Sequence, residues 1–139
     1  MLIAPMLLRF SLGEIEKRMF QTFMLAAALA ATPPTATALT VDQETALRCS
    51  ASFAIAAAEQ LRGAKWALAF PPLQASGKEF FVRTGARLMD EAGLSRTEVQ
   101  ALVQRQALAL RADMAKTSDS ATVFAGTMPL CLSLLEAAG

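Results

Sequence analysis

The chain has 139 residues, and its 13 basic and 12 acidic residues give a formal net charge of +1. This balance provides no electrostatic reason to bind nucleic acid. The absence of histidine excludes His-based triads and imidazole acid–base catalysis, and two cysteines alone cannot build the usual zinc site. No glycine-rich phosphate-binding motif occurs in the sequence either. We therefore expect no enzyme activity, no metal and no cofactor.

A cleavable export signal is predicted near the N-terminus. A short apolar run, Phe20–Ala31, follows two basic residues and precedes a pair of prolines. This order of basic, apolar and small residues is that of a secretory signal. Ala36 and Ala38 are the small residues that signal peptidase requires, so cleavage is expected before Leu39. The alternatives are an uncleaved membrane anchor and a cytosolic protein.

The first residues do not fit this signal, because residues 1–18 begin with a second apolar stretch. Our hypothesis is that translation begins at Met19 rather than Met1; the alternative is a long N-terminal region of the signal. In either case we expect residues 1–38 to be the signal peptide and residues 39–139 to be a single domain. That domain is expected in the periplasm, without stable membrane insertion after cleavage.

The first helix is predicted from Val41 to Arg62, after a capping box that begins at Thr40. Gly63 should end or bend this helix, and residues 64–70 could add a turn or two before two prolines. Its apolar positions recur at helical spacing and form a wide, alanine-rich face. The face comprises Leu47, Ala51, Ala54, Ala58 and Leu61, with Cys49, Phe53 and Ala57 beside it.

Two further helices are predicted to form a hairpin. The first is expected from Gly77 to Ala92, after a capping box at Ser76, and the second from Arg96 to Lys116. Gly93 should end the former, and a capping box of Ser95 and Glu98 should begin the latter. A connection this short turns the helices back on each other. The apolar stripes expected to face each other are Phe81 and Leu88 on one helix and Val99, Leu102 and Val103 on the other.

Residues 117–127 are rich in Ser, Thr, Asp and Gly and are predicted to be a loop. A last short helix is predicted over Met128–Ala137, with Pro129 in its first turn. No segment has the alternating pattern of a strand. The sequence therefore predicts an all-α domain, a small bundle of three to four helices.

The two cysteines, Cys49 and Cys131, lie beyond the predicted cleavage site and can form a disulfide in an oxidising compartment. Such a bond would fasten the C-terminal segment to the first helix. The alternative is two buried free thiols. A redox-active pair is not expected, because the spacing is not that of a C-x-x-C motif.

Three groups of side chains are candidates for contacts with other molecules. Trp66 and Phe70, followed by prolines, could present an aromatic contact patch, or they could cover the core as a lid. Arg83 and Arg87 lie one turn apart and could hold an anion, or they could form a solvated helix face. The adjacent phenylalanines at positions 80 and 81 are interpreted as core and core rim.

Four segments resemble small exported helical proteins of alphaproteobacteria whose role is unknown. The segments are Arg48–Ile55, Glu79–Val82, Ala86–Glu91 and Pro129–Leu135. The resemblance implies the same compartment and a Cys49–Cys131 pair, and it implies no activity. The leading hypothesis is a non-enzymatic periplasmic domain that acts through contacts with a protein partner. The alternatives are a small periplasmic stress chaperone and a helical bundle that binds an apolar ligand.

Overall fold

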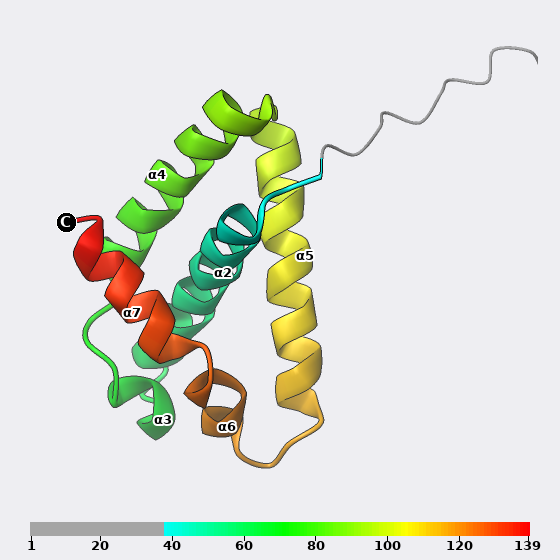
Figure 1. The fold of residues 1–139 in the computed structure, drawn as a ribbon. Helices are drawn as coiled ribbons and strands as arrows, with labels where there is room; N and C mark the ends of the chain where they lie inside the picture. The colour runs from blue at the N-terminus through cyan, green and yellow to red at the C-terminus, as the bar shows by residue number, and fades with distance from the viewer. Residues whose placement is uncertain (1–37) are drawn as a thin grey trace, which may run out of the picture. The chain divides into compact units, whose positions relative to one another are not determined.

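The computed structural model describes residues 38–139, which form one unit, and the predicted signal through residue 37, including Ala36, lies outside the described residues. The described part confirms the all-α prediction (Figure 1). Its helices are α2 (Val41–Leu61), α3 (Lys65–Leu68), α4 (Gln74–Ala92), α5 (Arg96–Ala115), α6 (Ser120–Ala125) and α7 (Met128–Ala137).

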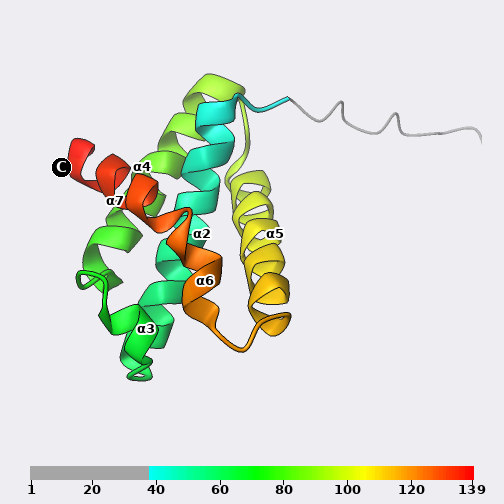
Figure 2. The same ribbon diagram turned by 60° about the horizontal axis from the view of Figure 1, so that its bottom comes forward.

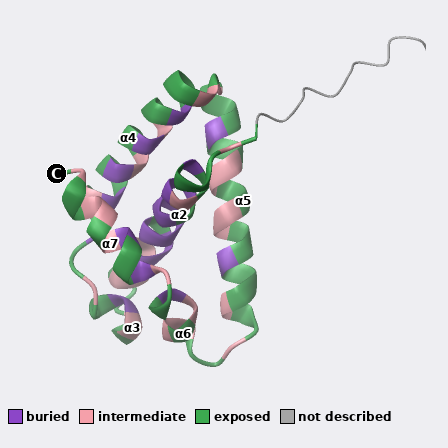
Figure 3. Cartoon of the chain, viewed as in Figure 1, coloured by how far each residue is buried: buried purple, intermediate pink, exposed green. Residues whose placement is uncertain are grey.

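The central helix is α2, which lies between α4 and α5 in both views (Figures 1 and 2). It begins as predicted: the Thr40 hydroxyl accepts from the Gln43 N–H at 3.2 Å, and the Gln43 side chain accepts from the Thr40 N–H at 3.0 Å. Gly63, at φ +76°, follows its C-terminal end. On its predicted face Leu47, Cys49, Ala51 and Phe53 are buried, and Ala57 and Ala58 are half-buried (Figure 3). Two positions were predicted wrongly, because Ala54 and Leu61 are exposed.

The exposure of Ala54 has a geometric cause. The helices α4 and α5 meet at one end and diverge toward the other (Figure 1). Ala54 lies in the resulting opening, where it lines a shallow apolar groove of about 270 Å³ together with Phe81 of α4 and Val103 of α5. The apolar face of α2 is therefore covered by α4 and α5 along only part of its length.

The helix α4 begins three residues before the predicted start, and the predicted capping box at Ser76 does not form. The Ser76 hydroxyl instead donates to the carbonyl of Pro72 at 3.2 Å. Leu73 precedes the helix and is buried in the core, and its N–H donates to the Gln60 side chain at 3.0 Å. A contact with α2 thus fixes the start of α4.

The hairpin of α4 and α5 is confirmed. Gly93 has the left-handed φ of +66° and ends α4, and the side chains of Ser95 and Glu98 cap α5 reciprocally. The predicted stripes meet on α2 in one apolar cluster. Its buried members are Leu47, Leu88 and Val99, with Leu39, Phe81, Leu94, Leu102 and Val103 packed against them.

The predicted loop at residues 117–127 contains the short helix α6, which the sequence pattern did not indicate. Asp119 caps it by accepting from the Ala121 N–H at 3.0 Å. Phe124 is fully buried, and its burial explains why this polar segment folds onto the domain. The last helix, α7, has the predicted bounds and carries Pro129 in its first turn.

Candidate functional site

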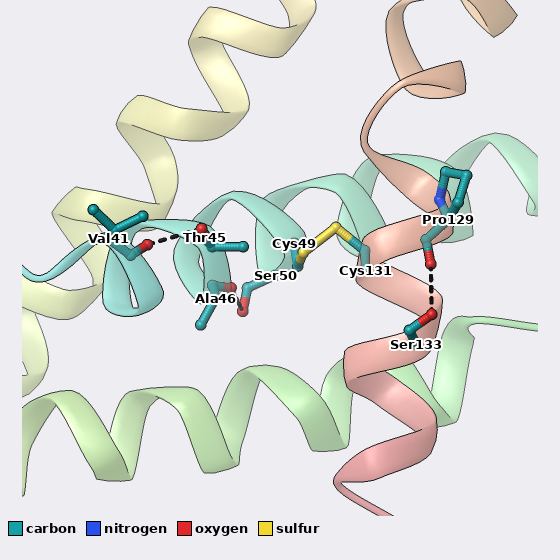
Figure 4. Close-up of a disulfide and its surroundings, with 8 residues drawn as sticks. All are labelled: Val41, Thr45, Ala46, Cys49, Ser50, Pro129, Cys131 and Ser133. Carbon is teal, nitrogen blue, oxygen red and sulfur yellow. Dashed lines mark hydrogen bonds between the residues drawn. A yellow bond between two sulfur atoms is a disulfide. The ribbon is translucent and has the colours of Figure 1, made fainter.

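The disulfide between Cys49 and Cys131 fastens α7 to the middle of α2 (Figure 4). Both cysteines are fully buried, and neither is free. The bond joins residues 82 positions apart in the sequence. Figure 4 shows α7 running from the disulfide across α2 toward α4, and α7 contacts both helices. The disulfide therefore sets where α7 lies on the α2–α4 pair.

Beside α7 lies an open groove of about 780 Å³, which we call the α2/α4/α7 groove. It is lined by Val41, Asp42, Thr45 and Ala46 of α2, Phe80, Arg83, Thr84 and Arg87 of α4, and Leu130, Leu134, Ala137 and Ala138 of the C-terminal segment. Its volume is within the range of small-molecule sites, roughly 300–1,000 Å³. The three walls come from distant parts of the sequence.

The apolar part of this groove has a buried floor and exposed edges. Ala46 and Phe80 are buried, and Phe80 packs edge-to-face on Phe53 of α2 with ring centres 5.3 Å apart. Val41 and Leu130 are large apolar side chains that remain 78% and 53% exposed. Both line the groove, so two of the exposed apolar side chains of the domain converge on one surface. Such convergence is typical of a binding surface.

Three of the polar side chains in the lining, Arg83, Thr84 and Arg87, lie on α4, and Asp42 and Thr45 lie on α2. Thr84 is only 6% exposed, yet its hydroxyl takes part in none of the hydrogen bonds between described residues. The hydroxyls of Thr45 and Ser50 on α2, in contrast, donate to the carbonyls of Val41 and Ala46 at 2.8 and 2.9 Å. Thr84 therefore offers an unused donor and acceptor at the groove wall.

The two arginines of the lining are held by exposed ion pairs within α4. Arg83 donates to Glu79, and Arg87 donates to Glu91 at 3.3 Å. The hydrogen bond from Arg87, and then that from Gln43 of α2, lowers the pKa of the Glu91 carboxyl. Because exposed i,i+4 pairs contribute only tenths of a kcal/mol, both guanidinium groups can exchange partners at little cost.

Trp66 and Phe70, the predicted contact patch, lie at the opposite end of α2 from its N-terminus. Both are half-buried and pack against the core. The Trp66 ring stacks on Phe124 of α6, with centres 4.7 Å apart, and meets Phe70 edge-on at 6.4 Å. This packing fits the interpretation of the pair as a lid. Leu68 lies between them and is 58% exposed.

The residues around the predicted cleavage site reach the edge of the described part. Ala38 is exposed, and Leu39 is half-buried and packs on the cluster of Leu47, Leu88 and Val99. The residue predicted to be the N-terminus of the mature domain, Leu39, thus packs against the core.

The sequence analysis named Arg83 and Arg87 as a possible anion site and Phe80 as a core residue, but it did not predict that they line one groove. It did not name Thr84. A signal for Thr84 exists: it lies four residues after Phe80 and four before Leu88, on the inward face of α4. A polar residue at that position is a candidate site residue. No group of three or more acidic or cysteine side chains that could hold a metal ion occurs among the described residues.

Comparison with protein-family models gives no match, and comparisons with the curated proteins and with the solved structures find none either. The resemblance to exported alphaproteobacterial proteins therefore stays a prediction. None of the described helices combines the length and apolarity needed to cross a membrane. The disulfide is typical of an oxidising compartment outside the cytoplasm.

Proposed function

We propose that this protein is a non-enzymatic periplasmic binding domain, and that its ligand site is the α2/α4/α7 groove. The observation that carries the proposal is the groove itself, which combines a buried apolar floor with the exposed side chains of Val41 and Leu130. Burial of such surface is the main favourable term in binding apolar molecules. The predicted export signal and the disulfide support a role in the periplasm.

Native mass spectrometry of the protein purified from its own cell compartment tests this proposal. We expect a bound apolar molecule, or uptake of the neutral dye Nile red by the emptied protein. Val41→Arg and Leu130→Arg should reduce binding, because each places a charge at the edge of the groove. Leu108→Arg is the matched control, since Leu108 is 64% exposed on α5 and does not line the groove. Dye binding that is equal in all of these proteins would contradict the proposal.

A second candidate is the protein contact expected from the sequence, and the exposure of Leu68 between Trp66 and Phe70 favours it. Leu61, at the end of α2, is also 70% exposed. A photo-crosslinking residue at position 68 should capture one discrete partner in cells, whereas the same residue at position 108 should not. Identical crosslinking patterns at the two positions would argue against a partner at this surface.

A further inference from the structure

We infer that the α2/α4/α7 groove binds a long-chain carboxylate, that is, a fatty acid anion. The acyl chain lies on the apolar floor, and Arg83, Thr84 and Arg87 hold the carboxylate. This inference rests on the proposed ligand-binding function and names the class of ligand.

The first support is the hydroxyl of Thr84. Thr84 lines the groove and takes part in none of the side-chain hydrogen bonds between described residues, and its hydroxyl is not among the fully buried polar atoms that lack a partner. The hydroxyl is therefore accessible from the groove and free to bond to another molecule. A ligand oxygen in the groove would supply an acceptor for this hydroxyl.

The charge of that oxygen follows from the neighbours of Thr84. Arg83 directly precedes Thr84, and Arg87 follows it by one helical turn; both line the same groove. Arg83 donates to Glu79 through one nitrogen, which leaves most of its five N–H groups available. Asp42 supplies one carboxylate to the lining, and Glu79 and Glu91, which pair with the two guanidinium groups, lie outside it. A ligand carboxylate that takes the place of these exposed partners fits this combination, because it can accept from the two guanidinium groups and from the Thr84 hydroxyl.

The apolar residues of the lining indicate that the remainder of the ligand is apolar. The α7 side contributes Leu130, Leu134 and two alanines, and the opposite side contributes Phe80, Ala46 and Val41. These side chains provide apolar contact without hydrogen-bonding groups. An unbranched acyl chain can lie against these apolar side chains, and burial of its methylene groups favours binding. The groove volume of about 780 Å³ accommodates such a chain.

The test compares three probes of equal chain length: laurate, methyl laurate and dodecyltrimethylammonium. Each is titrated as a monomer against the purified, oxidised protein, which has first been stripped of bound lipid. We expect laurate to bind at least about ten-fold more tightly than the ester, because a charged hydrogen bond contributes about 1.5–3 kcal/mol. The cationic probe should bind most weakly, because it meets two arginines.

Variants then locate the carboxylate. The double variant Arg83→Gln/Arg87→Gln and the single variant Thr84→Val should each weaken laurate binding by about ten-fold and leave binding of the ester nearly unchanged. Arg105→Gln, an exposed arginine of α5, is the matched control and should change neither. Thr84→Val keeps the shape of the side chain and removes no hydrogen bond, so its melting temperature should not fall. In carbon NMR, the labelled carboxyl of bound laurate should titrate at a lower pH in the wild type than in the double arginine variant.

Equal affinities for laurate and its ester would overturn the carboxylate assignment while the proposed function stands. Failure to bind either laurate or the ester would overturn both. Binding to anionic vesicles or to an acidic peptide without binding of monomeric laurate would also overturn the assignment, in favour of a macromolecular partner.

Discussion

Two glycines of α4 allow a direct test of how closely α4 approaches α2. A Cβ atom at Gly77 would lie 2.9 Å from the Cβ of Phe53, whereas a Cβ at Gly85 would meet only Val99 Cγ1 at 3.6 Å. The longer distance is an ordinary van der Waals contact, and the shorter one is not. We therefore predict that Gly77→Ala and Gly85→Ala change stability in opposite directions.

The expected magnitudes follow from helix propensity and packing. Replacing glycine by alanine inside a helix stabilises it by about 1 kcal/mol, and Gly85→Ala should gain most of this. At Gly77 the same gain is opposed by overpacking, which costs about 1–3 kcal/mol. Phe53 cannot easily move away, because it is fully buried and its ring packs edge-on against Phe80. Gly77→Ala should therefore be about 1–3 kcal/mol less stable than Gly85→Ala.

Urea unfolding of the oxidised proteins, followed by circular dichroism, measures this difference directly. Similar m-values in the two variants would show that the compared states are the same. If the two alanine variants were equally stabilised, α4 would not approach α2 as closely at Gly77 as described here. The placement of Phe53 against α4 would then be wrong as well.

Three further predictions concern the disulfide, a buried hydroxyl and a helix cap. Replacing Cys49 or Cys131 by Ser should lower stability by about 2–5 kcal/mol in urea unfolding, with single and double variants nearly equal, because each removes the same bond. Ser52→Ala should stabilise the protein by about 1 kcal/mol, because the buried Ser52 hydroxyl has no hydrogen-bond partner among the described residues. Ser50→Ala removes a hydrogen bond and should not stabilise it. Equal changes in stability for the two variants would refute this reasoning. Hydrogen bonds with the backbone and side chain of Ser95 lower the pKa of the Glu98 carboxyl. The ionised carboxylate therefore stabilises the fold at neutral pH, and this stabilisation is lost as the pH falls through the lowered pKa. Glu98→Gln should flatten the fall in melting temperature below about pH 5.

The sequence was sufficient for elements whose signals are local. The hairpin of α4 and α5 was predicted because Gly93 ends one helix and the Ser95–Glu98 capping box begins the next within a few residues. Each of these signals depends on backbone groups close in the chain. The apolar stripes then follow from helical periodicity, and the cluster around Leu47 confirms them.

The start of α4 was predicted wrongly because a distant side chain decides it. The Gln60 amide donates to the carbonyls of Ala67, Phe70 and Pro71, and its oxygen accepts from the Leu73 N–H. These bonds fix the whole connection between α2 and α4 and satisfy backbone groups that a local cap would otherwise serve. A capping box is a preference of the local chain, and contacts made by another helix can override it.

The α2/α4/α7 groove could not be predicted from the sequence, because its shape depends on how much of the surface of α2 and α4 is covered by α7. The helix α2 has 21 residues and α7 has 10, so at 1.5 Å per residue α7 is only about half as long. The disulfide fixes α7 near the middle of α2 and so decides which half of the α2–α4 surface stays open. Arg83, Thr84 and Arg87 lie in that open half, beside Val41. A longer α7 would cover these residues; with α7 at its present length they line the groove.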